Sequence, residues 1–298
     1  MKLLTDFDGV WTYPLAEGAA QGEALDTAFE AVAGDGERDA VRSWIARARS
    51  AIRAEPGRWG WVAGGRISAF ADEDPFTEHG ALLHYMEEAR AHDPLAARLA
   101  AAAELNAGTL DRFGGRAHAA GVERVEAARG PGITPAAADA GRLLLSRGVE
   151  VVVVSNSGTE KLRRWFEHAR VPFRIHHGRA VGALRLRGSA KKFVLDQARA
   201  DTIDVGGLAV DVARPHYESV LREELPDAVV GDVFSLDLAL PLALKRREPA
   251  WRDVRLFWLV HPYTPERMRR AIAGLPEGEV EAVEGGLPAV ANRLAHTD

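Results

Sequence analysis

Residues 2–12 read Lys2-Leu3-Leu4-Thr5-Asp6-Phe7-Asp8-Gly9-Val10-Trp11-Thr12. The apolar start of this stretch, Leu3-Leu4, has the composition of a buried strand and leads directly into two carboxylates, Asp6 and Asp8. Side chains two residues apart in an extended segment point the same way, so both acids can aim at one spot, and Gly9 then allows a sharp turn. Two neighbouring like charges are costly unless a cation or a shared proton compensates them. The stretch therefore predicts a strand that ends in an acidic site.

The composition is that of an ordinary globular protein. The 298 residues are 47% hydrophobic and 27% charged, which suits one large domain or two modest ones. A net charge of −5 gives no reason to expect a nucleic-acid or membrane partner, and the lack of cysteine excludes disulfides, thiolate nucleophiles and Cys-ligated zinc. No segment resembles a signal peptide and no apolar run could span a bilayer, so we expect a cytoplasmic enzyme.

Residues 14–130 are expected to form a separate helical domain. Apolar residues recur there at helical spacing, and no stretch has the pattern of a confident strand. The aromatic residues between 59 and 76 indicate a loop-rich passage, and Gly130-Pro131-Gly132 provides a return hinge. The expected helices are 22–55 with a break at 34–36, 78–92, and 93–113.

The rest of the chain alternates predicted strands with predicted helices. Val149 to Val154 is a nearly continuous β-branched run, typical of a strand buried on both faces. This alternation predicts an α/β fold, with residues 1–13 and 131–298 forming a Rossmann-like parallel sheet with helices on both faces. The other expected strands are 173–176, 206–210, 228–230, 254–260 and 280–283, and the expected helices are 136–146, 161–169, 190–200, 215–224, 265–273 and 287–295.

Ligands of such a sheet bind at the carboxyl ends of the strands, so the residues there are candidates for the site. Strand 149–154 is followed by Ser155-Asn156, where a hydroxyl and backbone N–H groups could bind a phosphoryl oxygen or simply cap the next helix. Strand 228–230 is followed by Asp232 and Asp237, whose hard oxygens suit Mg²⁺, although an Asp can also cap a turn.

These strand ends resemble motifs of the haloacid dehalogenase-like (HAD) superfamily, most of whose members are phosphohydrolases that form an aspartyl-phosphate. Asp-x-Asp-Gly-x-x-Thr at 6–12 resembles the first motif, the strand ending in Ser155 the second, and Gly-Asp-x-x-x-x-Asp at 231–237 the fourth. The resemblance covers residues 1–13 and 131–298 as a HAD-like core. It implies that residues 14–130 are a helical cap domain of the C1 type, inserted after the first motif.

The resemblance implies a Mg²⁺-dependent phosphomonoester hydrolase acting on a small phosphorylated metabolite. Asp6 would be the nucleophile, and Asp8 would protonate the leaving alcohol and then deprotonate water. Mg²⁺ would be held by Asp6, the backbone carbonyl of Asp8 and Asp232, with Asp237 in support, directly or through water. Ser155 and a cation would hold the phosphoryl oxygens.

The sequence departs from the family pattern at the third motif, which normally supplies a lysine at the start of the helix before the fourth motif. Here Arg214-Pro215 opens that helix, so Arg214 is the first candidate for the cation. Lys192, or its neighbour Lys191, is the alternative. Any of the three could instead lie on a solvated helix surface.

Other functions stay open. A phosphomutase would keep both acids, and a non-catalytic phosphate-binding or scaffold protein could keep the fold. A dehalogenase does not need a second aspartate, so Asp8 argues against that activity. His176-His177 and His261 have no further ligand at helical spacing, so we expect loop or core residues there rather than metal ligands.

Overall fold

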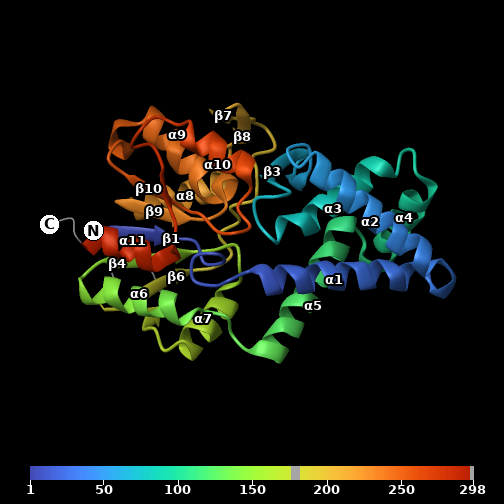
Figure 1. Ribbon diagram of the computed structural model, residues 1–298, viewed down its shortest axis with the longest axis horizontal. Coiled ribbons are helices and arrows are strands. Elements are labelled where there is room, and N and C mark those ends of the chain that lie inside the picture. The colour runs from blue at the N-terminus through green and yellow to red at the C-terminus, as the bar shows by residue number, and fades with distance from the viewer. Residues whose placement is uncertain (176–181, 296–298) are drawn as a thin grey trace. The chain divides into compact units, whose positions relative to one another are not determined.

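The computed structural model describes residues 1–175 and 182–295, and the chain divides into two compact units (Figure 1). Unit 1 comprises Met1–Tyr13 and Pro131–Asp298, and unit 2 comprises Pro14–Gly130. The chain thus leaves unit 1 just after the acidic stretch and returns at Pro131. None of the helices in the described ranges has the length and apolar character that a membrane span requires.

Unit 1 is built on a seven-stranded sheet whose strands all pair in parallel. β1 lies inside the sheet between β4 and β9, with Leu4 level with Val152 and Val229. The expected parallel α/β sheet is therefore confirmed. In spatial order the strands are β11 (Glu281–Val283), β10 (Arg255–Leu259), β9 (Ala228–Gly231), β1 (Lys2–Thr5), β4 (Glu150–Val154), β6 (Leu184–Arg187) and β5 (Phe173–Arg174).

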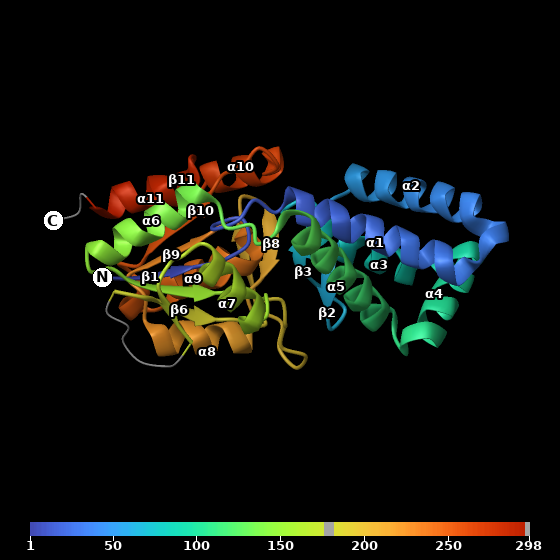
Figure 2. The ribbon, with the colours of Figure 1, turned by 90° about the horizontal axis from the view of Figure 1, so that it is seen from below.

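Helices cover both faces of this sheet. On one face, α6 (Pro135–Ser146), α7 (Thr159–His168) and α11 (Gly286–Ala295) share an apolar core with alternate strand residues such as Leu3 and Val153. α8 (Pro215–Glu224) lies on the opposite side from α6 and α11 (Figure 2). The other α-helices in the described part of unit 1 are α9 (Ala239–Arg247) and α10 (Glu266–Ala273).

A buried ion cluster attaches α8 to the sheet. Arg185 and Arg187 of β6 both donate hydrogen bonds to Glu224 of α8, which is 2% exposed. Burial alone would raise the pKa of Glu224, but the two guanidinium groups outweigh it and lower the pKa. Charged side chains thus occupy one face of a strand that lies inside the sheet.

Unit 2 packs five helices around its own apolar core. The expectation that this segment contains no strand was wrong, because β2 (Gly60–Ala63) and β3 (Arg66–Phe70) form an antiparallel hairpin. β2 has four residues of which one is buried, and β3 has five of which the last three are buried in succession, so neither strand shows hydrophobic alternation. The helices are α1 (Leu15–Ala33), α2 (Arg38–Ala54), α3 (Thr77–Ala89), α4 (Pro94–Ala107) and α5 (Leu110–Arg129).

Capping side chains explain the helix boundaries in the second half of unit 2. Asp93 accepts hydrogen bonds from Leu95 N and Ala96 N at the start of α4, as its sequence position suggested. The single expected helix 93–113 is nevertheless two helices, because Thr109 caps a new one by accepting from Arg112 N.

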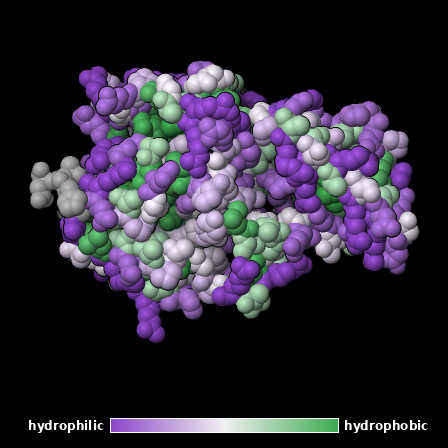
Figure 3. Space-filling view, in the orientation of Figure 1, coloured by the Kyte–Doolittle hydropathy of each residue, from purple (hydrophilic) through white to green (hydrophobic). Residues whose placement is uncertain are grey.

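Figure 3 shows mainly hydrophilic side chains on the visible face, consistent with two cores that bury the apolar residues.

Two expectations for unit 1 were wrong. The segment 190–200 forms turns instead of a helix, and the expected strand 206–210 is part of an antiparallel hairpin of β7 (Thr202–Val205) and β8 (Leu208–Asp211). β6 was not expected. The end of the expected strand 173–176 lies outside the described residues.

Candidate active site

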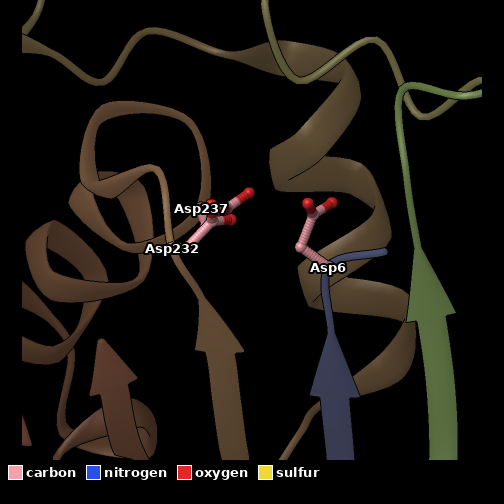
Figure 4. Close-up of side chains that lie close together, drawn as sticks. All are labelled: Asp6, Asp232 and Asp237. Carbon is pink, nitrogen blue, oxygen red and sulfur yellow. The ribbon is translucent and has the colours of Figure 1, made fainter. Parts of the chain in front are cut away.

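Three carboxylates converge at the carboxyl ends of β1 and β9 (Figure 4). Asp6 follows β1, and its backbone N donates to Val230 O of β9 at 2.9 Å, which places it beside the neighbouring strand end. Asp232 follows β9, and Asp237 lies in a short π-helix, Phe234–Leu238. One carboxylate oxygen of each acid lies within 4.8 Å of the others. Strand adjacency therefore brings Asp6 together with two acids that lie more than two hundred residues later in the sequence.

Two glycines make room for these carboxylates. Gly9 has φ +77°, and a Cβ there would lie 2.0 Å from Asp232 Oδ2. A Cβ at Gly231 would lie 2.3 Å from Asp237 Cβ. The glycine of each motif is thus required by the close approach of an acid, and at Gly9 also by the left-handed backbone.

The cation beside the nucleophile candidate is Lys192. Its Nζ lies 2.5 Å from Asp6 Oδ1 and 2.7 Å from Asp237 Oδ1, and the residue is 1% exposed. Burial opposes the charged ammonium, but Asp237 and Asp6 outweigh this and raise the pKa of Lys192. Arg214, our first candidate, does not occupy this position. Its Nη1 donates instead to the backbone oxygen of Lys192 at 2.5 Å, and Lys191 is exposed.

Hydrogen bonds to the end of β4 hold Lys192 in place. After β6, the backbone N of Ala190 donates to Ser155 O at 2.9 Å, and Lys192 N donates to Asn156 Oδ1 at 2.7 Å. These bonds take the place of the backbone hydrogen bonds of the helix that was expected at 190–200. Ser155 is buried at the end of β4, where its Oγ accepts from Ser157 N. The Asn156 side-chain oxygen, expected near phosphate, binds the Lys192 backbone.

The charge of this cluster suits a divalent metal ion. Burial, followed by repulsion from Asp237 and Asp8, raises the pKa of Asp6 to about 7, although Lys192 opposes the shift. When all three acids are ionised, Lys192 leaves two negative charges uncompensated. The donors are hard oxygens of the kind that Mg²⁺ prefers. The residues present therefore fit a Mg²⁺ ion.

The side chain of Asp8 belongs to a different set of contacts. Its Oδ2 accepts from Ser157 Oγ at 2.9 Å, and its Oδ1 lies 3.4 Å from Lys161 Nζ. The Asp8 carboxylate is not part of the group of three acids, so the side chains of Asp6 and Asp8 contact different partners. The sequence analysis missed Ser157 and Lys161. Their i, i+4 spacing across the start of α7 was the available signal.

Aromatic side chains surround Asp232. Tyr263 donates its hydroxyl to Asp232 Oδ2 at 2.9 Å, and Trp258 donates Nε1 to Asp232 O at 2.8 Å. His261 stacks on Tyr263 with ring centroids 4.9 Å apart, and burial lowers the pKa of His261. Within the described ranges the three acids form the group with metal-ligand geometry, and His261 is not part of it. His176-His177 lie outside the described residues.

No family model matches the sequence, and no curated protein matches it. Seven parallel strands place the residues after β1, β4 and β9 at one edge of the sheet. Unit 1 has a parallel α/β fold with the candidate site at the carboxyl ends of its strands.

Two solved structures are similar to this chain. A haloacid dehalogenase-like hydrolase by description, from Burkholderia xenovorans, has 13% identity and a TM-score of 0.42, covering 99% of this chain and 96% of its own. YfnB from Bacillus subtilis, described as a HAD hydrolase bound to magnesium, has 12% identity and a TM-score of 0.38, covering 87% of each chain.

The raised pKa of Asp6 makes metal binding pH-dependent in a stated direction. In the metal-free protein Asp6 holds a proton below about pH 7 and must lose it before that oxygen can bind a cation. Apparent Mg²⁺ affinity is therefore expected to strengthen by up to about tenfold per pH unit between about pH 5 and about pH 7, and then to level off. Isothermal titration calorimetry measures this. Affinity that does not change over that range would contradict the prediction.

Proposed function

We propose that the protein is a Mg²⁺-dependent phosphomonoester hydrolase that works through an aspartyl-phosphate on Asp6. The observation that supports this best is the convergence of Asp6, Asp232, Asp237 and Lys192 on one spot. A nucleophilic carboxylate, further acids for a divalent cation and a buried ammonium are the parts that phosphoryl transfer needs. Ser155, at the end of the neighbouring strand β4, would contribute to the phosphoryl site.

The residues would share the reaction as follows. Asp6 attacks phosphorus in line while the bond to the leaving oxygen breaks, and Asp8 gives that oxygen a proton. Asp8 then takes a proton from water, which attacks the aspartyl-phosphate, releases inorganic phosphate and restores Asp6. Lys192 faces Asp6 and stabilises the charge of the phosphoryl oxygens. Held by Asp6, Asp232 and Asp237, Mg²⁺ would supply further neutralisation of the anions.

We further propose that unit 2 is the cap of this enzyme. It is inserted between the acidic stretch and Pro131, and it has an apolar core of its own. A separately folded unit in that place could exclude water and select the substrate. A helical cap of this size favours a small phosphorylated metabolite as the substrate.

The proposed function predicts metal-dependent hydrolysis of p-nitrophenyl phosphate. Treatment with EDTA should abolish release of p-nitrophenol, and excess Mg²⁺ should restore it, because the three carboxylates repel a phosphate dianion without a cation. The assay is absorbance of p-nitrophenol, followed by phosphate release from a panel of phosphorylated metabolites.

Three outcomes would contradict this function. Turnover that persists in EDTA would show that the reaction does not need a metal ion. Transfer of the phosphoryl group to a substrate hydroxyl would indicate a phosphomutase. No turnover of any phosphoester would favour a phosphate-binding or scaffold protein.

A further inference from the structure

We propose that Lys161 and Ser157 are positioning residues that orient the Asp8 carboxyl group toward the leaving oxygen. The inference rests on the proposed function, because it assigns a role to the contacts of the residue that serves there as acid and base. Neither residue belongs to the group of Asp6, Asp232 and Asp237, and neither was expected at the site from the sequence.

The two residues hold both oxygens of one carboxyl group. Ser157 Oγ donates to Asp8 Oδ2 at 2.9 Å, Lys161 Nζ lies 3.4 Å from Asp8 Oδ1, and Lys161 Nζ lies 3.5 Å from Ser157 Oγ. The terminal torsion of an aspartate is broad when nothing restrains it. Partners on both oxygens restrict that rotation, so the plane of the carboxyl group is set before substrate binds.

Lys161 is itself held from two sides. Its Nζ lies 4.7 Å from the ring centroid of Trp165 and 5.8 Å from that of Phe7, within reach of cation–π attraction. Lys161 and Trp165 are four residues apart on α7 and share one side of the helix, and Ser157 lies just before the helix begins. The Lys161 side chain is 12% exposed, which limits its alternative positions.

Each acid of the first motif therefore has its own ammonium group. Lys192 from the loop after β6 serves Asp6, whereas Lys161 from α7 serves Asp8. Changing Lys161 leaves the contacts of Asp6 in place. Its loss should impair protonation of the leaving oxygen more than nucleophilic attack.

Leaving groups of different basicity distinguish the contribution of proton donation from that of nucleophilic attack. p-Nitrophenolate departs with little help from an acid, whereas the more basic phenolate of phenyl phosphate needs protonation. We expect the ratio of kcat/KM for p-nitrophenyl phosphate to that for phenyl phosphate to rise about tenfold in Lys161→Met and in Ser157→Ala. Asp8→Asn should raise it further, and Lys161→Arg should restore part of the wild-type ratio.

The control is Arg163→Gln on the same helix, because Arg163 pairs with Glu160 and Glu167 at the surface. Its ratio should equal that of the wild type. A wild-type ratio in both Lys161→Met and Ser157→Ala would overturn the inference while leaving the proposed function intact. If one variant does not fold, as judged by circular dichroism, the other decides. Absence of wild-type turnover would overturn the proposed function and this inference with it.

Discussion

Replacement of Asp6 by asparagine is expected to lower kcat for p-nitrophenyl phosphate by at least about 10⁴-fold. An amide of almost the same shape cannot form the aspartyl-phosphate. The variant should remain folded, because burial already disfavours the ionised form of Asp6 and Lys192 keeps its contact with Asp237. Steady-state kinetics and the thermal midpoint of unfolding, Tm, measure the two effects.

The matched control is Asp139→Asn. Asp139 lies on α6 with its side chain 75% exposed and pairs with Arg142 one turn away, so its loss should change neither kcat nor Tm appreciably. An Asp6→Asn protein that keeps kcat within about tenfold of the wild type would rule out Asp6 as the nucleophile.

Loss of the Lys192 ammonium is expected to have the second largest effect. Lys192→Met should lower kcat/KM by about 10³-fold, because it removes the cation that faces the nucleophile. In the absence of metal it should also destabilise the fold by about 3–5 kcal/mol, since Asp6 and Asp237 lose their shared buried partner. Kinetics with saturating Mg²⁺ and urea unfolding in EDTA measure these two quantities.

Arg214→Met distinguishes the two candidate cations. The Arg214 side chain is fully buried and reaches the backbone oxygen of Lys192, so Arg214→Met should reduce stability. It should lower kcat/KM at least about tenfold less than Lys192→Met does. A larger loss of activity in Arg214→Met than in Lys192→Met would show that the guanidinium group, not the ammonium group, serves the phosphoryl group.

The sequence was informative wherever local pattern and strand adjacency were enough. An apolar strand followed by Asp6 and another followed by Asp232 point to one edge, because parallel strands end on the same side of a sheet. The apolar runs at β1, β4 and β9 were visible in the sequence because each is a local pattern. The same reasoning placed Ser155 beside the acids.

Residues positioned by long-range contacts were harder to predict. Lys192 is placed by the hydrogen bonds of Ala190 N to Ser155 O and of its own backbone N to Asn156 Oδ1, which no local periodicity reveals. β6 was hidden because Arg185 and Arg187 interrupt its apolar residues. These charges are tolerated inside the sheet because both pair with Glu224 on α8, a contact that the sequence does not reveal. The spacing of the family motifs along the sequence favoured Arg214 over Lys192. That spacing carries no information about the turn that directs Lys192 toward Asp6.

Trapping the covalent intermediate is the sharpest test of whether Asp6 is the nucleophile. Wild-type and Asp8→Asn proteins would be mixed with p-nitrophenyl phosphate and Mg²⁺, quenched in acid and digested, and their peptides analysed by mass spectrometry. We expect a phosphoryl adduct on Asp6 that accumulates in Asp8→Asn, because this variant lacks the base for hydrolysis. Turnover without an adduct, or with the adduct on another residue, would contradict it.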